Sequence, residues 1–322
     1  MKEKNNNNVS LFQFRACRRS LIFAVLTVTF SLYASGLFTS AALAAQATVR
    51  WPVLAAIIQY RVKQLNAVGI DADRVETFIR QAAANGAKIV VTPETTFYRF
   101  SVWTQNGVTQ LDLANNYNSL VNRFSNLSKE LGISLVIGLR KPSGDPILPT
   151  YNVAIFFGPD GNILGTHRKV IPATNETAFT MSGDQSDLKV FMTPYGKTGM
   201  LICRDMDDYW PSQALVSQGM GLLIGISADP GVGGPGRGWQ KVYPACAQGG
   251  ICYGIGANQI GTNIDDKTNG GSGFVAPGGH RLSAAGFNGV PNDERILYET
   301  LYLPDANHVA DLSGPLFLLL RH

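Results

Sequence analysis

Residues 199–211, GMLICRDMDDYWP, constrain the fold more than any other stretch, because polarity changes abruptly within them. The apolar run Met200–Ile202 leads into Cys203, and charge follows directly at Arg204 and Asp205. A short apolar run that ends in charged residues is typical of a buried strand arriving at a turn. The pattern therefore predicts that Cys203 lies at a strand-to-turn junction, where a rigid backbone can present its side chain to a pocket. Such a position suits a nucleophile.

A buried structural role is the competing interpretation of Cys203, because cysteine is among the most buried residue types. Two upstream segments favour the nucleophile. The segment IVVTPETTF ends its apolar part at Glu94, and the segment RKVIPATNE carries Lys169 and Glu176. Since each segment places a charged residue just beyond an apolar strand, one edge of a sheet can gather Glu94, Lys169 and Cys203.

These segments resemble the nitrilase superfamily of carbon–nitrogen hydrolases, whose members use a Glu–Lys–Cys triad in this chain order. The resemblance extends from about Val53 to Leu303. It is most specific in RKVIPATNE (168–176) and SGDQSDLKVFMTPYGKTGMLIC (182–203). It implies a four-layer α-β-β-α sandwich, a small-molecule amide or nitrile substrate, no cofactor, and a homodimer or larger assembly.

The resemblance implies a role for each matching position. Cys203 is the expected nucleophile, and Glu94 is the expected general base, which takes the thiol proton and later activates water. Lys169 and the backbone N–H of Arg204 are expected to stabilise the oxyanion. Glu176 matches the family's second, structural glutamate, which would hold Lys169 and Glu94 in place and tune their charges.

The residues directly after Cys203 depart from the nitrilase branch, which usually has Trp-Glu there. In this chain Arg204 and Asp205 follow, and Asp207 and Asp208 add negative charge beside the expected pocket. The flanking pattern favours nitrilases, whereas the residues nearest the nucleophile favour amidases. The sequence therefore predicts a carbon–nitrogen hydrolase, with an amide preferred over a nitrile as substrate.

An apolar segment near the N-terminus predicts export. A basic stretch ending at Arg19 precedes an apolar segment that runs to about Ala45, and the small residues AALAAQA offer a cleavage site after Ala44. Residues 1–44 are therefore predicted to be a signal peptide, and the mature protein to be periplasmic or secreted. The alternative is an uncleaved membrane anchor facing outside, because the apolar run is long enough to cross a bilayer.

The basic charge of the whole chain comes from this leader and indicates no anionic partner. Residues 1–44 hold five basic residues and one acidic residue, which leaves 22 of each sign in the rest of the chain. A basic stripe and a Gly-rich phosphate loop are both missing from the sequence, which argues against a nucleic-acid partner. Four scattered histidines and no paired cysteine spacing provide no metal-ligand set.

Helical and strand patterns alternate through residues 51–303, which suits one domain, and the resemblance implies that it is a carbon–nitrogen hydrolase domain. The expected helices cover residues 71–85, 113–131, 212–219 and 239–248. The expected strands cover residues 54–60, 88–92, 133–139, 152–157, 163–167, 189–193, 199–203, 222–227, 251–258, 272–276, 280–284 and 296–303. Alternating helices and strands with several hairpins predict an α/β fold, the four-layer α-β-β-α sandwich that the resemblance implies.

Three further features have open interpretations. The C-terminal tail, residues 304–322, contains an apolar run that predicts either an oligomer contact or a last strand packed on its own subunit. Cys246 and Cys252 flank a predicted helix-to-strand turn and are expected to be buried thiols, with a disulfide as the alternative. His167 has no evident catalytic partner and is expected to be structural.

Two other classes of function remain as alternatives. An apolipoprotein N-acyltransferase has the same kind of domain and transfers an acyl group to an amine outside the cytoplasm. Such enzymes carry several membrane spans, whereas this chain has one apolar segment at most. A non-catalytic small-molecule binding module would require the order and context of Glu94, Lys169 and Cys203 to be incidental.

Overall fold

The computed structural model describes residues 50–62, 72–97, 104–105, 108–229, 237–249, 252–261, 270–286, 288–290 and 292–304. These residues form two six-stranded sheets with the strand orders β14-β1-β2-β5-β6-β7 and β13-β12-β11-β10-β9-β8. The predicted leader, residues 1–44, and the tail beyond Pro304 lie outside the described residues. Within the described ranges, no helix combines the length and the apolar composition that a membrane span needs.

The strands of both sheets follow the predicted order along the chain. The first sheet contains β1 (Arg50–Gln59), β2 (Ile89–Val91), β5 (Ser134–Pro142), β6 (Thr150–Phe157), β7 (Ile163–Arg168) and β14 (Arg295–Pro304). The second contains β8 (Val190–Thr193), β9 (Gly196–Ile202), β10 (Leu222–Ser227), β11 (Tyr253–Asn258), β12 (Gly273–Ala276) and β13 (His280–Ala284). A separate small hairpin pairs β3 (Thr104–Gln105) with β4 (Val108–Thr109).

The central strands of each sheet are parallel, and this arrangement positions the site. Strands β1, β2 and β5 pair in parallel in the first sheet, as do β9, β10 and β11 in the second. Parallel strands buried on both faces read as continuous apolar runs, as in the buried IVV of β2 and LLIGIS of β10. Because parallel strands end at the same edge, the residues that follow β9 and β10 share one edge of the second sheet.

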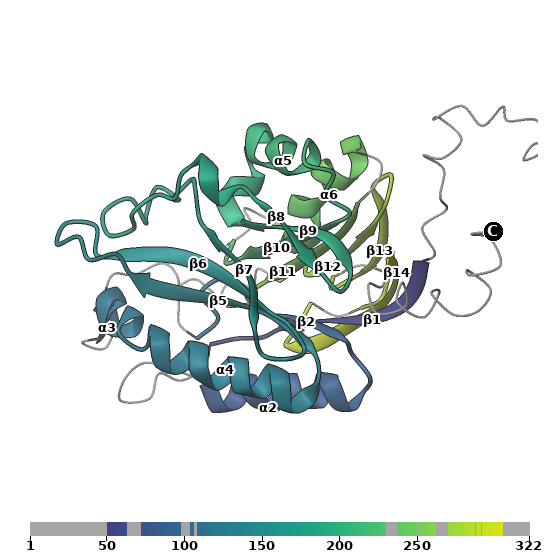
Figure 1. Cartoon of the computed structure of the whole chain (residues 1–322), viewed down its shortest axis with the longest axis horizontal. Coiled ribbons are helices and arrows are strands. Elements are labelled where there is room, and N and C mark those ends of the chain that lie inside the picture. Colours follow the sequence, from purple (N-terminus) through teal and green to yellow (C-terminus); the bar gives the residue numbers. More distant parts are fainter. Residues whose placement is uncertain are drawn as a thin grey trace, which may run out of the picture. The chain divides into compact units, whose positions relative to one another are not determined.

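Helices cover the outer face of each sheet, which gives the four layers that Figure 1 shows. On the first sheet lie α2 (Ala72–Ala84), α3 (Gln110–Ala114) and α4 (Tyr117–Leu131), and on the second lie α5 (Tyr209–Val216) and α6 (Gly238–Gly249). Separate apolar clusters fill the spaces between these layers, and the one between the sheets includes Ile57, Ile202 and Ile224. The predicted α-β-β-α sandwich is therefore confirmed.

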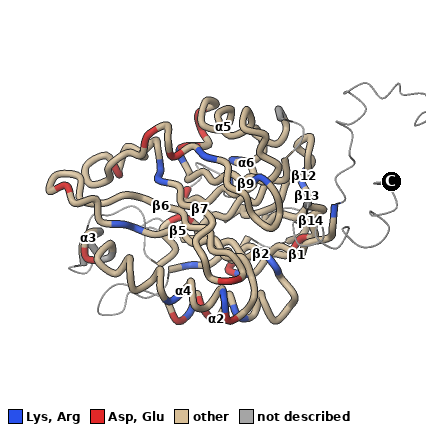
Figure 2. Tube along the Cα trace, viewed as in Figure 1, with Lys and Arg blue, Asp and Glu red and all other residues tan. Residues whose placement is uncertain are grey.

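The outward faces of α2 and α4 carry opposite charges side by side, as Figure 2 shows. Arg80 on α2 pairs with Glu130 on α4 at 2.6 Å, and Arg123 on α4 pairs with Asp73 on α2 at 2.6 Å. Exposed pairs of this kind contribute little to stability. The buried apolar faces of the two helices, such as Val75 on α2, therefore hold them to the sheet.

Two helices differ from the prediction at their starts. The predicted helix 113–131 is instead two helices, because the chain turns at Asn115 and Asn116, where the Asn116 side chain donates to the Asp112 carbonyl at 2.9 Å. A side-chain bond of this kind competes with helical backbone bonds. Helix α5 begins at Tyr209 and so includes Pro211, which a first turn tolerates because its N–H groups have no intrahelical partner.

The buried cysteines of the second sheet's outer layer lead to a prediction about thiols. Cys246 on α6 and Cys252 just before β11 are unbridged, and each is at most 1% exposed. We expect the denatured, unreduced protein without residues 1–44 to contain three reactive thiols, since Cys203 is also unbridged. Thiol counting with a chromogenic disulfide reagent measures this number. A single reactive thiol would show instead that Cys246 and Cys252 are bridged.

Candidate active site

Glu94 lies in a tight turn just after β2. Thr95 adopts a φ of 43°, an uncommon value that indicates a constrained turn. The Thr96 hydroxyl donates to the Pro93 carbonyl at 2.8 Å, and the Thr96 backbone N–H donates to the Gly138 carbonyl at 2.9 Å. These bonds hold the turn against β5, and Glu94 itself is fully buried.

The close contact between this turn and β5 requires glycine at position 138. A Cβ atom on Gly138 would lie 2.6 Å from the Pro93 carbonyl oxygen and 2.9 Å from the Glu94 Cα atom, both of them backbone. We therefore expect Gly138→Ala to displace the Glu94 turn and to lower the free energy of unfolding by about 1–3 kcal/mol. Denaturant titration measures the loss. Gly221→Ala is the control, since its Cβ would meet nothing closer than 3.8 Å; equal stability of the two variants would contradict the expectation.

The Glu94 carboxylate has partners from three strand ends. Its Oε1 atom accepts from Lys169 Nζ at 2.8 Å and from Asn152 Nδ2 at 2.6 Å. Its Oε2 atom accepts from the Ala228 backbone N–H at 2.7 Å. A buried charge is tolerated only when it is paired and hydrogen-bonded. Lys169 follows β7 in the first sheet and Ala228 follows β10 in the second, so the carboxylate lies between the two sheets.

Glu176 extends this contact into a network of five buried side chains, which also includes Glu94, Lys169, Arg140 and Asn152. Lys169 Nζ donates to Glu176 Oε2 at 2.5 Å, while Arg140 Nη2 and Asn152 Nδ2 each donate to Glu176 Oε1 at 2.9 Å. Arg140 and Asn152 are directly opposite each other on the antiparallel strands β5 and β6. Two buried carboxylates thus face two buried cations, and the charges balance.

The paired charges set the protonation states of the network. Burial alone would lower the pKa of Lys169, but Glu176 and Glu94 outweigh it and raise that pKa above its ordinary value. Burial alone would raise the pKa of Glu176, but Lys169 and Arg140 outweigh it and hold that pKa at about 2. Lys169 is therefore an ammonium group and Glu176 a carboxylate at neutral pH.

The low pKa of Glu176 predicts how stability depends on pH. Because the folded value of about 2 lies below the ordinary value of 4.5, the stability that ionised Glu176 confers is fully present above about pH 5. It is lost as pH falls from about 4.5 through 2. We expect Glu176→Gln to have a smaller slope of unfolding free energy against pH over this window, as measured by denaturant titration. Glu130→Gln, at an exposed ion pair, is the control, and identical slopes for all three proteins would contradict the assignment.

Cys203 lies directly after β9, at the first position of a 3-10 turn that ends at Met206. Its φ of 47° is rare for a residue other than glycine, and such strained positions cluster at functional sites. The predicted strand 199–203 therefore ends one residue early. The Cys203 side chain is 7% exposed, and Met200 and Ile202 from β9 belong to the same apolar cluster.

The Cys203 thiol is protonated at rest. Burial raises the pKa of Cys203, the nearby negative charge of Glu94 raises it further, and Lys169 and Lys241 only partly oppose this shift. Since the thiolate is the reactive form, a base must remove the proton as the sulfur attacks. Glu94 accepts a hydrogen bond from Lys169 and acts electrostatically on the sulfur, so it is the candidate for that base.

Arg204 follows Cys203 in the 3-10 turn, with its side chain exposed. The first N–H groups of such a turn have no acceptor inside it and point outward. The use of the Arg204 backbone N–H as an oxyanion donor stays a prediction. The structure thus brings Glu94 and Glu176 each into contact with Lys169, and it places Cys203 within electrostatic reach of Glu94 and Lys169.

Two members of the network were missed by sequence reasoning. Arg140 ends the apolar run SLVIGL of β5, so it shows the same signal that singled out Glu94 and Lys169: a charged residue at the end of an apolar strand. Asn152 precedes the apolar run VAIFF of β6, where a single amide gives no such contrast. Only the strand pairing shows that both side chains reach Glu176.

A second group of charges lies beside Cys203. Lys241 on α6 contacts Asp207 Oδ1 at 2.6 Å and Asp229 Oδ2 at 2.8 Å, and Arg237 pairs with Asp229 at 2.9 Å. Burial would lower the pKa of Lys241, but the interactions with Cys203 and the two carboxylates raise it. Lys241 therefore connects two segments of the site. Asp207 follows the turn that begins at Cys203, and Asp229 follows Ala228, whose N–H binds Glu94.

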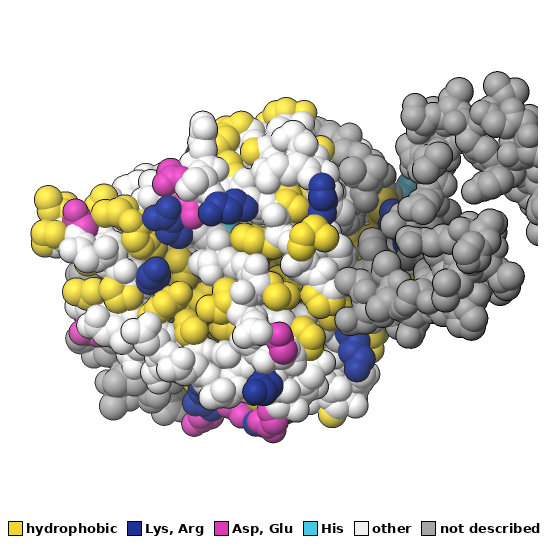
Figure 3. Space-filling view, viewed as in Figure 1, with side chains coloured by type: hydrophobic (Ala, Val, Ile, Leu, Met, Phe, Trp, Pro, Cys, Tyr) yellow, Lys and Arg dark blue, Asp and Glu magenta, His cyan; other side chains and the backbone are white. Residues whose placement is uncertain are grey.

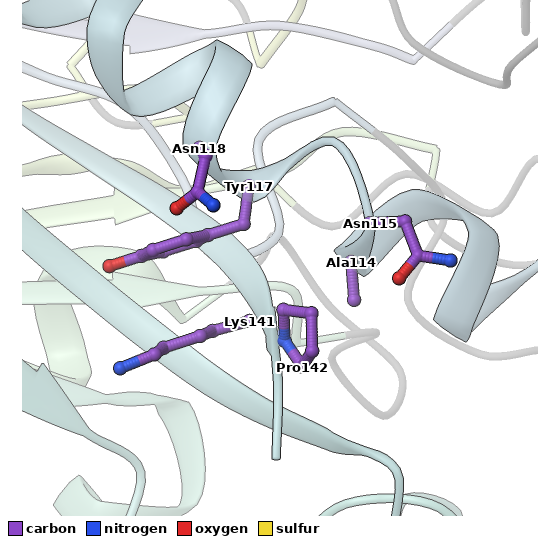
Figure 4. A pocket seen from close by; sticks show the side chains of 6 residues that line it. All are labelled: Ala114, Asn115, Tyr117, Asn118, Lys141 and Pro142. Carbon is purple, nitrogen blue, oxygen red and sulfur yellow. The ribbon is translucent and has the colours of Figure 1, made fainter. Parts of the chain in front are cut away.

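A separate hollow of about 350 Å³ lies between the start of α4 and the end of β5. Figure 4 shows the Lys141 side chain running alongside the Tyr117 ring, with Asn115 and Asn118 at its margins; the Lys141 amine lies 5.7 Å from the ring centroid. Successive residues of a strand point to opposite faces. Lys141 therefore faces away from the buried network to which its neighbour Arg140 belongs. Among the described residues, no cluster of His, Cys, Asp and Glu has the arrangement of a metal site.

The fold and the site together define a class of protein: an α-β-β-α sandwich with a cysteine at a strand end beside a buried glutamate–lysine pair. The model of the carbon-nitrogen hydrolase family matches residues 54–305, and the chain belongs to this family. The matched region nearly coincides with the predicted domain, residues 51–303.

Relatives with known names include both nitrilases and amidases. Nitrilase 3 from Arabidopsis thaliana is 31% identical over 203 residues, which cover 58% of this chain and 56% of that protein. Omega-amidase NIT2 from Danio rerio is 28% identical over 275 residues, which cover 80% of this chain and 90% of that protein. The match thus spans little more than half the length of the plant nitrilase.

Solved structures of this family have the same fold. The carbon-nitrogen hydrolase from Helicobacter pylori G27 has a TM-score of 0.66 at 19% identity, and the match covers 84% of this chain and 96% of that one. An amidase from Nesterenkonia sp. has a TM-score of 0.63 at 19% identity, covering 83% of this chain and 96% of that one. At such identities the likeness shows the fold alone.

Proposed function

We propose that the protein is an exported hydrolase that cleaves the carbon–nitrogen bond of a small amide through a thioester on Cys203. One observation carries the proposal: Glu94 is a fully buried carboxylate 2.8 Å from the Lys169 ammonium, and both act electrostatically on the Cys203 sulfur. A base, a cation and a nucleophile that share one buried site are the groups that acyl transfer requires.

In the first half of the reaction, Glu94 takes the thiol proton as the Cys203 sulfur attacks the amide carbon. The Lys169 ammonium and the Arg204 backbone N–H stabilise the oxyanion that forms. The intermediate then expels the amine, or ammonia from a primary amide, and the leaving nitrogen receives the proton that Glu94 holds. The product of this half is a thioester between the acyl group and Cys203.

In the second half, Glu94 removes a proton from a water molecule as that water attacks the thioester. The same cation and N–H stabilise the second oxyanion, which collapses to a carboxylic acid and releases the Cys203 sulfur. The proton on Glu94 returns to the sulfur and restores the resting thiol. Glu176 and Asn152 hold Lys169 and Glu94 in place, and Arg140 holds Glu176.

Amides are favoured over nitriles as substrates for two reasons. Cys203 is followed by Arg204 and Asp205 instead of the Trp-Glu of nitrilases, and the omega-amidase relative aligns over far more of its length than the nitrilase does. Incubation of the purified protein with simple primary amides and with the matching nitriles, scored for ammonia and carboxylate, tests this choice. Turnover of nitriles alone would refute the amide assignment, and turnover of neither would favour a binding module.

An acyltransferase is distinguished in the same experiment. If an added primary amine captures most of the acyl group in place of water, the protein transfers acyl groups in the manner of an N-acyltransferase.

The site of action and the assembly are also proposals. We infer export with cleavage after Ala44, and the N-terminal sequence of the exported protein tests it: an intact leader would indicate a membrane tether.

We further infer at least a dimer, and exposed Tyr209, Trp210 and Tyr243 on α5 and α6 support an apolar contact surface. Hydrophobic side chains are visible over this layer in Figure 3. Sedimentation that shows a monomer would refute the dimer, and deletion of residues 313–322 tests the predicted tail contact.

A further inference from the structure

A fully buried histidine–aspartate pair lies between the segments that carry Lys169 and Cys203. His167 Nε2 lies 2.8 Å from Asp205 Oδ2, and neither side chain is exposed to solvent. His167 lies on β7, two residues before Lys169, and Asp205 lies in the 3-10 turn, two residues after Cys203. The pair therefore connects the edge of the first sheet with the nucleophile turn of the second.

Asp205 also binds the backbone on both sides of this connection. Its Oδ1 atom accepts from the N–H groups of Val170 and Ile171 at 3.0 and 2.8 Å, directly after Lys169. Its Oδ2 atom accepts from the N–H of Ile202 at 3.1 Å, directly before Cys203. An ionised carboxylate is an acceptor with room for about four bonds, so four N–H donors match it fully.

The second ring nitrogen of His167 determines how many protons the pair holds. His167 Nδ1 lies 3.0 Å from the Asp187 carbonyl oxygen, which can only accept, so Nδ1 carries a proton. Nε2 also faces an acceptor, the Asp205 carboxylate. A neutral imidazole has one N–H, and therefore cannot satisfy both contacts with an ionised partner. An imidazolium with both nitrogens protonated satisfies both.

The neighbouring charges do not compete for this proton. The Asp187 carboxylate accepts from Arg168 Nε at 2.9 Å and so has a cation of its own. Lys169 directs its ammonium group to Glu94 and Glu176. Among the described residues, Asp205 is therefore the carboxylate that contacts the His167 ring.

We propose that His167 and Asp205 form a buried imidazolium–carboxylate pair that fixes the Lys169 ammonium relative to the Cys203 sulfur. Both are positioning residues: each acts through the backbone next to a reacting group. The charge state stands on hydrogen-bond geometry alone, whereas the catalytic consequence rests on the proposed function. The proposal adds a charge and a positioning role to the structural role that the sequence predicts for His167.

Nitrogen NMR on the ring of His167 tests the charge state without any substrate. The chain has four histidines, so His280→Gln, His308→Gln and His322→Gln together leave His167 as the one labelled imidazole. At pH 7 we expect both ring nitrogens to show attached protons and imidazolium shifts. A neutral ring with a single proton on Nδ1 would overturn the proposal. This measurement keeps His167 and Asp205 intact, so it does not depend on the folding of a variant at either position.

Asp205→Asn tests the positioning role. The amide keeps the shape of the side chain, and its NH₂ group can donate to a neutral His167 ring, so the labelled ring should change to the neutral form. We expect kcat to fall about 10–100-fold with KM changed less than about twofold, because a displaced cation and nucleophile weaken the transition state more than substrate binding. Unchanged kcat in folded Asp205→Asn would refute the role.

A matched control separates the fall in kcat expected for Asp205→Asn from the effect of removing a negative charge elsewhere in this part of the protein. Asp184, 65% exposed, pairs with Arg168 at 3.2 Å in the same part of the chain. Asp184→Asn should leave kcat, KM and the His167 ring spectrum as they are in the parent protein. Equal losses of kcat in both variants would show a general electrostatic effect and refute positioning by Asp205. If the hydrolase assignment itself fails, the ring spectrum still decides the charge state.

Discussion

Replacement of Cys203 by alanine is expected to abolish hydrolysis while the protein stays folded. The sulfur is the only atom at this position able to form the acyl intermediate, so no residual route through the thioester remains. The side chain is 7% exposed and lies at a strand end, and alanine adopts the same φ of 47° with no added strain. Ammonia release measures the activity, and circular dichroism and the thermal midpoint measure the fold.

Cys252→Ala is the matched control for this variant. Cys252 is likewise a buried thiol, but it belongs to the apolar cluster that contains Val242 of α6 and not to the cluster that contains Cys203. It should keep most of the activity and lose some stability, as large-to-small core changes do. Substantial activity in a folded Cys203→Ala protein would refute the mechanism as a whole.

Lys169→Met should have the second-largest effect, and it should affect both activity and stability. Loss of a group that stabilises the oxyanion typically costs about 10²–10³-fold in kcat. Removal of the cation also leaves Glu94 and Glu176 as buried carboxylates with fewer partners, and breaking a buried pair in this way costs about 3–5 kcal/mol. Steady-state kinetics and denaturant titration measure the two losses.

Lys189→Met is the control for the loss of a lysine, since Lys189 is exposed. It should change neither kcat nor stability appreciably. The double variant Lys169→Met/Glu176→Gln should recover part of the stability but none of the activity, because it removes one of the two stranded carboxylates. A Lys169→Met protein as stable and as active as the parent would contradict the buried network.

The order of strands and helices could be predicted because the central strands are apolar on both faces and the helices are amphipathic. Glu94, Lys169 and Cys203 could be singled out because each stands where an apolar run ends in polarity. The resemblance to a known family gave them roles. The sequence did not predict the helix ends that local hydrogen bonds determine. One example is Asn116, whose side chain interrupts the predicted helix.

The rest of the site could not be predicted because it depends on which strands are neighbours. Asn152 contacts Glu94 from 58 residues away in the sequence, and Ala228 does so from 134 residues away. The sequence singles out Asp205 only as a charged residue after Cys203, yet Asp205 is fully buried and binds the backbone after Lys169. Strand pairing and sheet packing, which local sequence does not encode, bring these groups together.

The central claim is that Cys203 forms a thioester, and mass spectrometry of the acid-quenched reaction tests it most directly. During turnover of a primary amide, the peptide that contains Cys203 should gain the mass of the amide minus ammonia, and neutral hydroxylamine should remove that mass. The adduct should be missing from Cys203→Ala. Steady hydrolysis with no adduct on Cys203 at any quench time, or an adduct on another residue, would contradict the account.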